Sequence, residues 1–211
     1  MDTRTRAYST NNRRSRRRKE QGRIRRRDNL KRKALPWPAH RPRRAPALAT
    51  GNDTRYRQPV TPRQVEALIA AVRFWVEGED DLRALALAGS WARGDARPNS
   101  DVDLLIVANE PAARRCPEEW LPDISFAAAG FEIDDCEART YGDVWSCHVS
   151  LHSDGEVELT FAPPAWASAS SLDPGTTFVV RDAFRVIVDK DGALQRLIAA
   201  VRAHGAPNTG V

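Results

Sequence analysis

The sequence predicts a domain of the α/β (α+β) class behind a disordered basic N-terminal arm. Three observations support this prediction: residues 1–58 carry 20 Lys and Arg against 4 acidic residues, an amphipathic helix pattern follows them, and the later apolar runs have the length of strands. A chain of 211 residues has room for one domain and an appendage. We therefore divide it into an Arg-rich segment, residues 1–58, and a folded domain, residues 59–211.

The Arg-rich segment has few apolar residues and no helical or strand periodicity, so we expect it to be disordered. Its net charge of +16 contrasts with −11 for residues 59–211. Two interpretations remain open: an arm that neutralises nucleic-acid phosphates, or a solvated tail without function, which includes the case of a wrongly chosen start codon. Nucleic acid is the less favoured partner, because the folded domain is acidic and does not interleave basic with aromatic residues as single-strand binders do.

Several classes of protein are excluded by composition. No apolar run approaches the roughly 18 to 20 residues of a membrane-spanning helix, and the N-terminus lacks the apolar segment of about 7 to 15 residues that marks a secretory signal. We therefore expect a cytoplasmic protein without a membrane partner. Cys116, Cys136 and Cys147 form no Cys-x-x-Cys pair, so we expect three reduced thiols and no structural zinc.

The first folded element is a helix that begins after Thr61. Thr61 can act as N-cap, Pro62 suits the first helical position, and Gln64 completes a capping box. Gly78 is a plausible end. The apolar residues that follow share one helical face and predict core packing: Val65, Leu68, Ile69, Val72, Trp75 and Val76.

For the rest of the domain, the sequence predicts mainly strands. Residues 82–89 and 101–108 predict two strands joined by a turn, and a closing helix is expected at 193–203 after a strand at 183–189. A further strand is expected at 131–138, and residues 145–151 and 156–162 predict a hairpin around a Ser-Asp-Gly turn. With Gly155 left-handed, the preferred register places His148 opposite Thr160 and Ser150 opposite Glu158, which separates an apolar from a polar face.

Candidate chemistry is concentrated between residues 89 and 103. Side chains alternate along a strand, so Asp101 and Asp103 project from the same face. Two converging carboxylates repel each other, and a divalent cation with oxygen ligands, such as Mg²⁺, relieves that repulsion. Gly89 leaves room for a phosphate, and the backbone N–H groups after it, from Ser90 onward, can bind one.

The segment GSWARGDARPNSDVDLLIV, residues 89–107, closely resembles the signature of the polymerase-β-like nucleotidyltransferase superfamily, in particular its minimal and antibiotic-adenylylating branches. The resemblance implies a mixed sheet flanked by helices, in which Asp101 and Asp103 hold two Mg²⁺ ions and Gly89 and Ser90 bind the β and γ phosphates. The implied reaction moves a nucleoside monophosphate, with AMP from ATP the favoured case, to a hydroxyl of a small molecule or protein and releases pyrophosphate.

Members of this superfamily generally carry a third carboxylate on a later strand. Glu158 is our choice for it as a catalytic and metal-binding residue, and Glu156, nearer the hairpin loop, is the alternative. Arg93 is a candidate phosphate ligand. We interpret His148 and His152 as residues that fill the polar face rather than as bases.

One alternative to an active enzyme stays open. The chain could be a catalytically silent nucleotide-binding module, regulatory or antitoxin-like, that acts with a partner protein. Little chain remains for a separate acceptor domain, so a homodimer or a partner protein could complete the pocket. The acceptor and the base preference are not encoded in any motif that we recognise.

Overall fold

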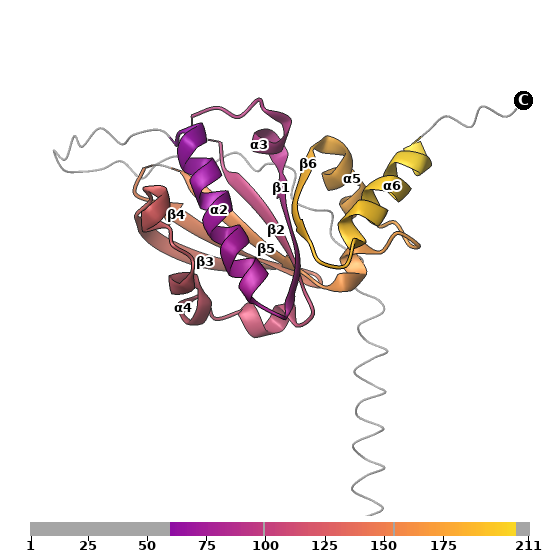
Figure 1. Cartoon of the computed structure of the whole chain (residues 1–211), viewed down its shortest axis with the longest axis horizontal. Helices are drawn as coiled ribbons and strands as arrows, with labels where there is room; N and C mark the ends of the chain where they lie inside the picture. The colour runs from indigo at the N-terminus through magenta and orange to yellow at the C-terminus, as the bar shows by residue number, and fades with distance from the viewer. Residues whose placement is uncertain (1–59, 99, 154, 206–211) are drawn as a thin grey trace, which may run out of the picture. The chain divides into compact units, whose positions relative to one another are not determined.

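The computed structural model describes residues 60–98, 100–153 and 155–205, and their strands form one six-stranded sheet in the order β3-β4-β5-β2-β1-β6 (Figure 1). β2 and β5 run parallel and the other neighbours are antiparallel. The predicted mixed sheet with flanking helices is confirmed, whereas the predicted disordered arm, residues 1–58, lies outside the described residues. The strands are β1 (Leu82–Ala88), β2 (Val102–Ala108), β3 (Ile133–Tyr141), β4 (Val144–Leu151), β5 (Glu156–Ala162) and β6 (Phe184–Asp189).

Helix α2 (Pro62–Gly78) covers one face of the sheet and begins as predicted. The Thr61 hydroxyl accepts from the Gln64 N–H, and the Gln64 side chain accepts in return from the Thr61 N–H. The predicted apolar face is buried, and Trp75 stacks on Trp120 with ring centroids 5.3 Å apart. Aromatic side chains of the sheet extend this cluster, which makes this face a dry core.

Between β2 and β3 the described chain forms short helical pieces rather than strands. Helix α4 (Pro117–Trp120) is flanked by the 3₁₀ turns η2 (Pro111–Arg114), η3 (Leu121–Asp123) and η4 (Ala127–Ala129). Trp120 donates from its indole N–H to the carbonyl of Arg114 at 2.7 Å, so the segment closes the end of the aromatic cluster.

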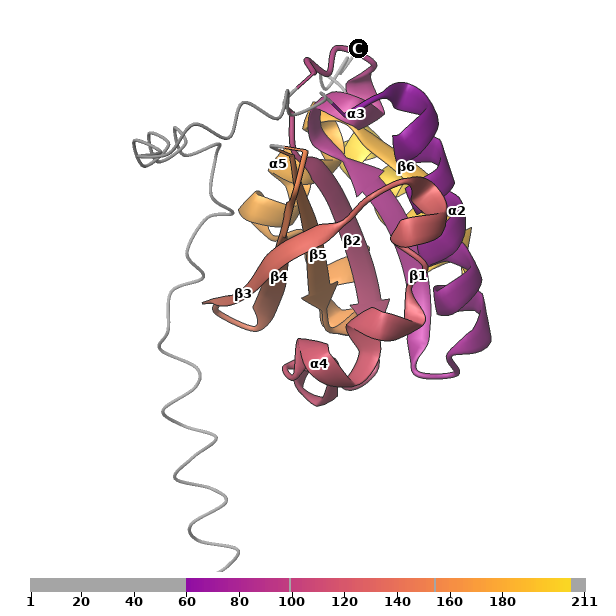
Figure 2. The ribbon, with the colours of Figure 1, turned by 90° about the vertical axis from the view of Figure 1, so that its left-hand side faces the viewer.

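Helices α5 (Pro174–Asp182) and α6 (Ala193–Gly205) belong to the opposite face of the sheet, and Figure 2 shows α5 and α2 on different sides of it. The 3₁₀ turn η5 (Pro164–Ala167) precedes them. A second apolar cluster joins alanines of β1 and branched aliphatic residues of β2 to Leu194, Leu197 and Val201 of α6. The sequence predicted α6 but not α5, whose N-cap is Asp173.

The predicted hairpin register of β4 and β5 is wrong by two residues. His148 lies opposite Glu158, and Ser150 lies opposite Glu156. Because side chains alternate with a period of two, this shift leaves every residue on its predicted face, so polarity could not detect it. Gly155 is not left-handed; a Cβ there would lie 2.6 Å from Cγ2 of Val60, so close packing requires the glycine.

The expectation of three reduced thiols is also wrong. Cys136 of β3 and Cys147 of β4 form a disulfide, with Cα atoms 6.4 Å apart, while Cys116 is free and exposed. The two cysteines are 11 residues apart in the chain, and the antiparallel β3–β4 pairing brings them together. None of the helices in the described ranges combines the length and apolarity that a bilayer crossing requires.

Candidate active site

The turn after β1 places the Gly-Ser pair against the start of β2. Ala88, the last residue of β1, lies opposite Asp103. Gly89 then begins helix α3 (Gly89–Arg93) with a left-handed φ of 66°. A Cβ on Gly89 would lie 2.4 Å from Oδ2 of Asp103. Both the backbone angle and the close carboxylate therefore require glycine here.

The loop between α3 and β2 is held by hydrogen bonds that fix where β2 begins. Gly94 ends α3 with a φ of 81° and donates to the carbonyl of Ser90 at 3.0 Å. Trp91 packs against the core and donates from its indole N–H to the carbonyl of Ser100 at 3.2 Å. Ser100 immediately precedes Asp101, so the side chain of Trp91 anchors the chain at the predicted carboxylates.

Three strands bring the predicted carboxylates and the glycine together. Asp103 lies on β2 between Ala88 of β1 and Glu158 of β5, with which it is in register across the parallel pair. Asp101 lies just before β2. The face that carries Asp103 is the one opposite α2, because its neighbours Leu104 and Ile106 belong to the α2 core.

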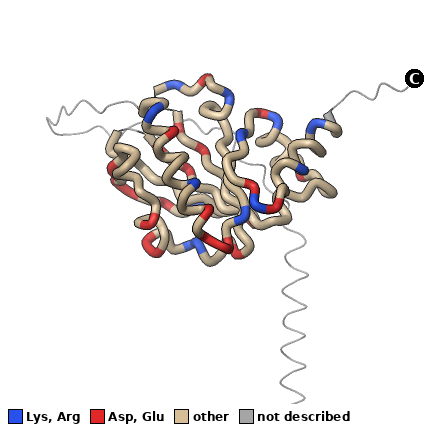
Figure 3. Tube along the Cα trace, viewed as in Figure 1, with Lys and Arg blue, Asp and Glu red and all other residues tan. Residues whose placement is uncertain are grey.

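The electrostatics of Asp103 reflect this crowding. Burial raises the pKa of Asp103 well above its ordinary value, and the charges of Glu158, Asp101 and Glu156 raise it further, whereas Arg93 lowers it. Acidic residues also outnumber basic ones in residues 59–211, with 24 against 13, and they are spread over the described elements (Figure 3). Acidic charge therefore predominates in this domain, and Arg93 supplies positive charge that partly offsets it at Asp103.

His148 lies beside two of these carboxylates. Its Nδ1 is 2.6 Å from Oε1 of Glu156, and its Nε2 is 3.8 Å from Oε1 of Glu158. The ring is buried, and Nε2 has no hydrogen-bond partner among the described residues. His152 is exposed and pairs instead with Asp134, away from Glu158. Of the two histidines, only His148 belongs to the site.

Arg93, the predicted phosphate ligand, ends α3 and is paired with two carboxylates. It donates to Asp95 at 3.1 Å and to Asp182, the last residue of α5. The hydrogen bond to Asp95 and the nearby charge of Asp182 raise the pKa of Arg93 above its ordinary value. A phosphate at Arg93 would have to compete with these two partners.

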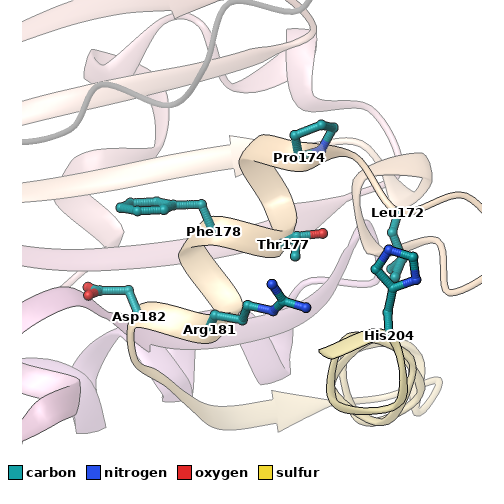
Figure 4. Close-up of a pocket in the computed structure, with 7 residues that line it drawn as sticks. All are labelled: Leu172, Pro174, Thr177, Phe178, Arg181, Asp182 and His204. Atoms are coloured by element: carbon teal, nitrogen blue, oxygen red, sulfur yellow. The ribbon is translucent and has the colours of Figure 1, made fainter. Parts of the chain in front are cut away.

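Helix α5 covers part of the carboxylate face. Val179 of α5, Asp103 and Thr160 line one small recess. A separate cavity of about 550 Å³ lies between α5 and α6. In Figure 4, Phe178 and Asp182 point to one side of α5, and His204 lies on the other. None of Gly89, Ser90, Arg93, Asp101, Asp103 and Glu158 lines that cavity.

The residues at the start of β2 and β5 fit a divalent cation chemically. Asp101, Asp103 and Glu158 offer only oxygen donors, as Mg²⁺ prefers. Burial, and after it the charges of neighbouring carboxylates, raise the pKa of Asp103, and a bound cation would offset both effects. The described residues contain no group of three or more His, Cys, Asp or Glu side chains already gathered for metal binding. The fit therefore rests on donor type and charge, not on a preformed cage.

Sequence reasoning overlooked three residues around Glu158 and Asp103: Ser146, Thr160 and Val179. Thr160 donates to Oε1 of Glu158 at 3.0 Å, and Ser146 lies 2.8 Å from Thr160. Both hydroxyls are buried, within strands that are otherwise largely apolar. A polar residue inside such a strand was the available signal for Ser146 and Thr160. Val179 had none, because α5 itself was not predicted.

Comparison with known families adds a finding to this geometry. Residues 73–144 match the family model of the nucleotidyltransferase domain. The matched range includes β1, α3 and β2, and therefore the Gly-Ser pair and both aspartates, while β5 with Glu158 lies beyond it. The chain matches none of the curated proteins with which it was compared.

Proposed function

We propose that this protein transfers AMP from ATP to a hydroxyl of a small molecule or protein, in a Mg²⁺-dependent reaction that releases pyrophosphate. The match of residues 73–144 to the nucleotidyltransferase domain supports nucleotidyl transfer. The observation that carries the proposal is the register of the sheet. Asp103 lies between the Gly-Ser turn after β1 and Glu158 on β5, and burial together with the neighbouring carboxylates raises its pKa. Such a site favours a cation with bound phosphates.

In the proposed reaction, the acceptor hydroxyl oxygen forms a bond to the α-phosphorus while the bond from that phosphorus to the β-phosphate oxygen breaks. Asp101, Asp103 and Glu158 would hold Mg²⁺, which supplies charge neutralisation at the phosphates and lowers the pKa of the acceptor hydroxyl. Glu158 accepts the proton of that hydroxyl, and pyrophosphate leaves with the displaced electron pair.

The turn after β1 is the part of the site that would bind the phosphates. Gly89 carries no side chain, and its backbone lies directly beside the carboxylate of Asp103. Ser90 follows it in α3, so backbone N–H groups of this turn lie close to the proposed cation ligands. Arg93 adds positive charge at the end of the same helix once Asp95 and Asp182 release it. The cost of that exchange is small, because the three side chains are partly exposed to solvent.

Two measurements test the proposal. Calorimetry should detect ATP binding that requires Mg²⁺ and weakens in Asp103→Asn. Transfer of label from α-labelled ATP to a panel of hydroxyl acceptors should be lost in Asp103→Ala and Glu158→Gln. Glu118→Gln changes a carboxylate of α4 and serves as the matched control. Transfer that persists in Asp103→Ala would refute the proposal.

The same assays separate the remaining alternatives. A larger loss in Glu158→Gln than in Glu156→Gln would support Glu158 as the third carboxylate, and the reverse order would assign the role to Glu156. Mg²⁺-dependent ATP binding without transfer to any acceptor would favour the silent module that acts with a partner protein. Deletion of residues 1–58 should leave transfer unchanged, and a loss would favour a role in nucleic-acid binding.

A further inference from the structure

Two buried hydroxyl groups lie next to Glu158. Ser146 of β4 is 0% exposed and Thr160 of β5 is 2% exposed, in strands whose other buried residues are mostly apolar. They lie directly opposite each other in the β4–β5 pair. Because residues i and i+2 of a strand share a face, Thr160 lies on the same side of the sheet as Glu158.

The direction of the hydrogen bonds follows from the number of protons. Thr160 donates its hydroxyl proton to Oε1 of Glu158 at 3.0 Å. Its oxygen is 2.8 Å from the hydroxyl oxygen of Ser146, and since the proton of Thr160 is already used, Ser146 must be the donor in that contact. The chain therefore runs from Ser146 to Thr160 to Glu158, and each donor in it is satisfied.

This chain engages only one oxygen of the carboxylate. Oε1 of Glu158 accepts from Thr160 and faces Nε2 of His148 at 3.8 Å. Within the described parts of the chain, Oε2 makes no hydrogen bond. We propose that Ser146 and Thr160 are positioning residues: they hold Oε1 of Glu158 and thereby leave Oε2 oriented for the cation and the acceptor hydroxyl. This inference rests on the proposed role of Glu158.

The carboxylate of Glu158 can adopt other orientations unless it is held. Its side chain is 13% exposed, so it keeps some freedom to rotate. Without the Thr160 hydroxyl, no hydrogen bond from the described residues holds Oε1 of Glu158, and the carboxylate can leave the orientation seen here. Groups that orient metal ligands in this way typically contribute about 10- to 100-fold in metal affinity or activity.

The test compares substitutions that keep or remove the hydroxyl. Thr160→Val removes it at nearly constant volume and should lower kcat by about 10- to 100-fold with little change in KM for ATP. Thr160→Ser keeps the hydroxyl and should recover most of the loss. Thr176→Val is the matched control, because Thr176 of α5 is also 2% exposed but its hydroxyl has no partner among the described residues.

A double-mutant comparison tests whether the two hydroxyls act as one chain. Ser146→Ala should lower kcat less than Thr160→Val, because Thr160 can still donate to Glu158. The variant with both substitutions should be no slower than Thr160→Val alone. Additive losses would contradict the chain.

A second readout does not depend on turnover. Mn²⁺ binding followed by electron paramagnetic resonance should be weaker in Thr160→Val than in Thr160→Ser and Thr176→Val. If wild type binds Mn²⁺ in this pattern but transfers no label, the proposed function fails and the positioning role remains. Equal losses in Thr160→Val and Thr160→Ser, equal Mn²⁺ affinity in all variants, or no Mn²⁺ binding would overturn the inference.

Discussion

Substitution of Gly89 by alanine isolates the close contact between the turn after β1 and Asp103. The new Cβ would lie 2.4 Å from Oδ2 of Asp103. Ordinary contacts of this kind lie at about 3.5 Å, so the carboxylate or the turn must move by about 1 Å. The same substitution places an L side chain at a φ of 66°.

These two effects have different magnitudes and different readouts. The left-handed backbone angle costs about 1–2 kcal/mol of stability in a residue with a Cβ. A displacement of about 1 Å at a reacting group costs about 100-fold in rate. Gly89→Ala is therefore expected to remain folded, with a modest loss of stability and a large loss of nucleotidyl transfer.

Two other glycines supply controls for the stability cost of the left-handed backbone angle alone. Gly94 and Gly142 have φ values of 81° and 64°, and a Cβ on either would meet nothing within 4 Å. Their alanine variants should lose similar stability in urea denaturation while keeping transfer of α-labelled ATP. If Gly89→Ala lost no more activity than Gly94→Ala and Gly142→Ala, the argument that the turn abuts the working carboxylate would be refuted.

Three further predictions address charge and capping. Burial and neighbouring carboxylates raise the pKa of Asp103 in the folded protein. Its ionisation therefore opposes folding once the pH exceeds the pKa of the unfolded chain, about 3.9. In EDTA, Asp103→Asn should raise Tm at pH 8, and this gain in Tm should vanish toward pH 3. An unchanged Tm at pH 8 would contradict this. Asp182→Asn removes one of the two carboxylates paired with Arg93 and should tighten ATP binding in calorimetry by less than about tenfold. Weaker binding would indicate that Asp182 itself aids nucleotide binding. Thr61→Ala removes the cap of α2 and should cost about 1 kcal/mol in urea denaturation without changing kcat, and a change in kcat would link α2 to the site.

Local parts of the site could be predicted because the chain needs few residues to build them. Helix α3 and a loop join β1 to β2, and antiparallel pairing then returns Asp103 to a place opposite Ala88. Because Gly89 directly follows Ala88, this pairing brings the glycine near Asp103. The same reasoning failed for α5, because its TFVV run is aromatic and β-branched and so favours a strand by propensity. In the structure it is a helix that Asp173 caps, and its buried residues, Thr176 and Val179, are three positions apart on one helical face.

The choice between Glu156 and Glu158 shows where periodicity stops being informative. Both residues have the parity of the polar face, so alternation along β5 cannot separate them. The parallel pairing of β2 with β5 does separate them, because it sets Glu158 in register with Asp103. Glu156 instead lies 2.6 Å from Nδ1 of His148. Oε1 of Glu158 accepts from the hydroxyl of Thr160 at 3.0 Å, and the register with Asp103 is what favours Glu158. Its place as the third carboxylate stays a prediction, and it depends on a pairing between strands that are far apart in the chain.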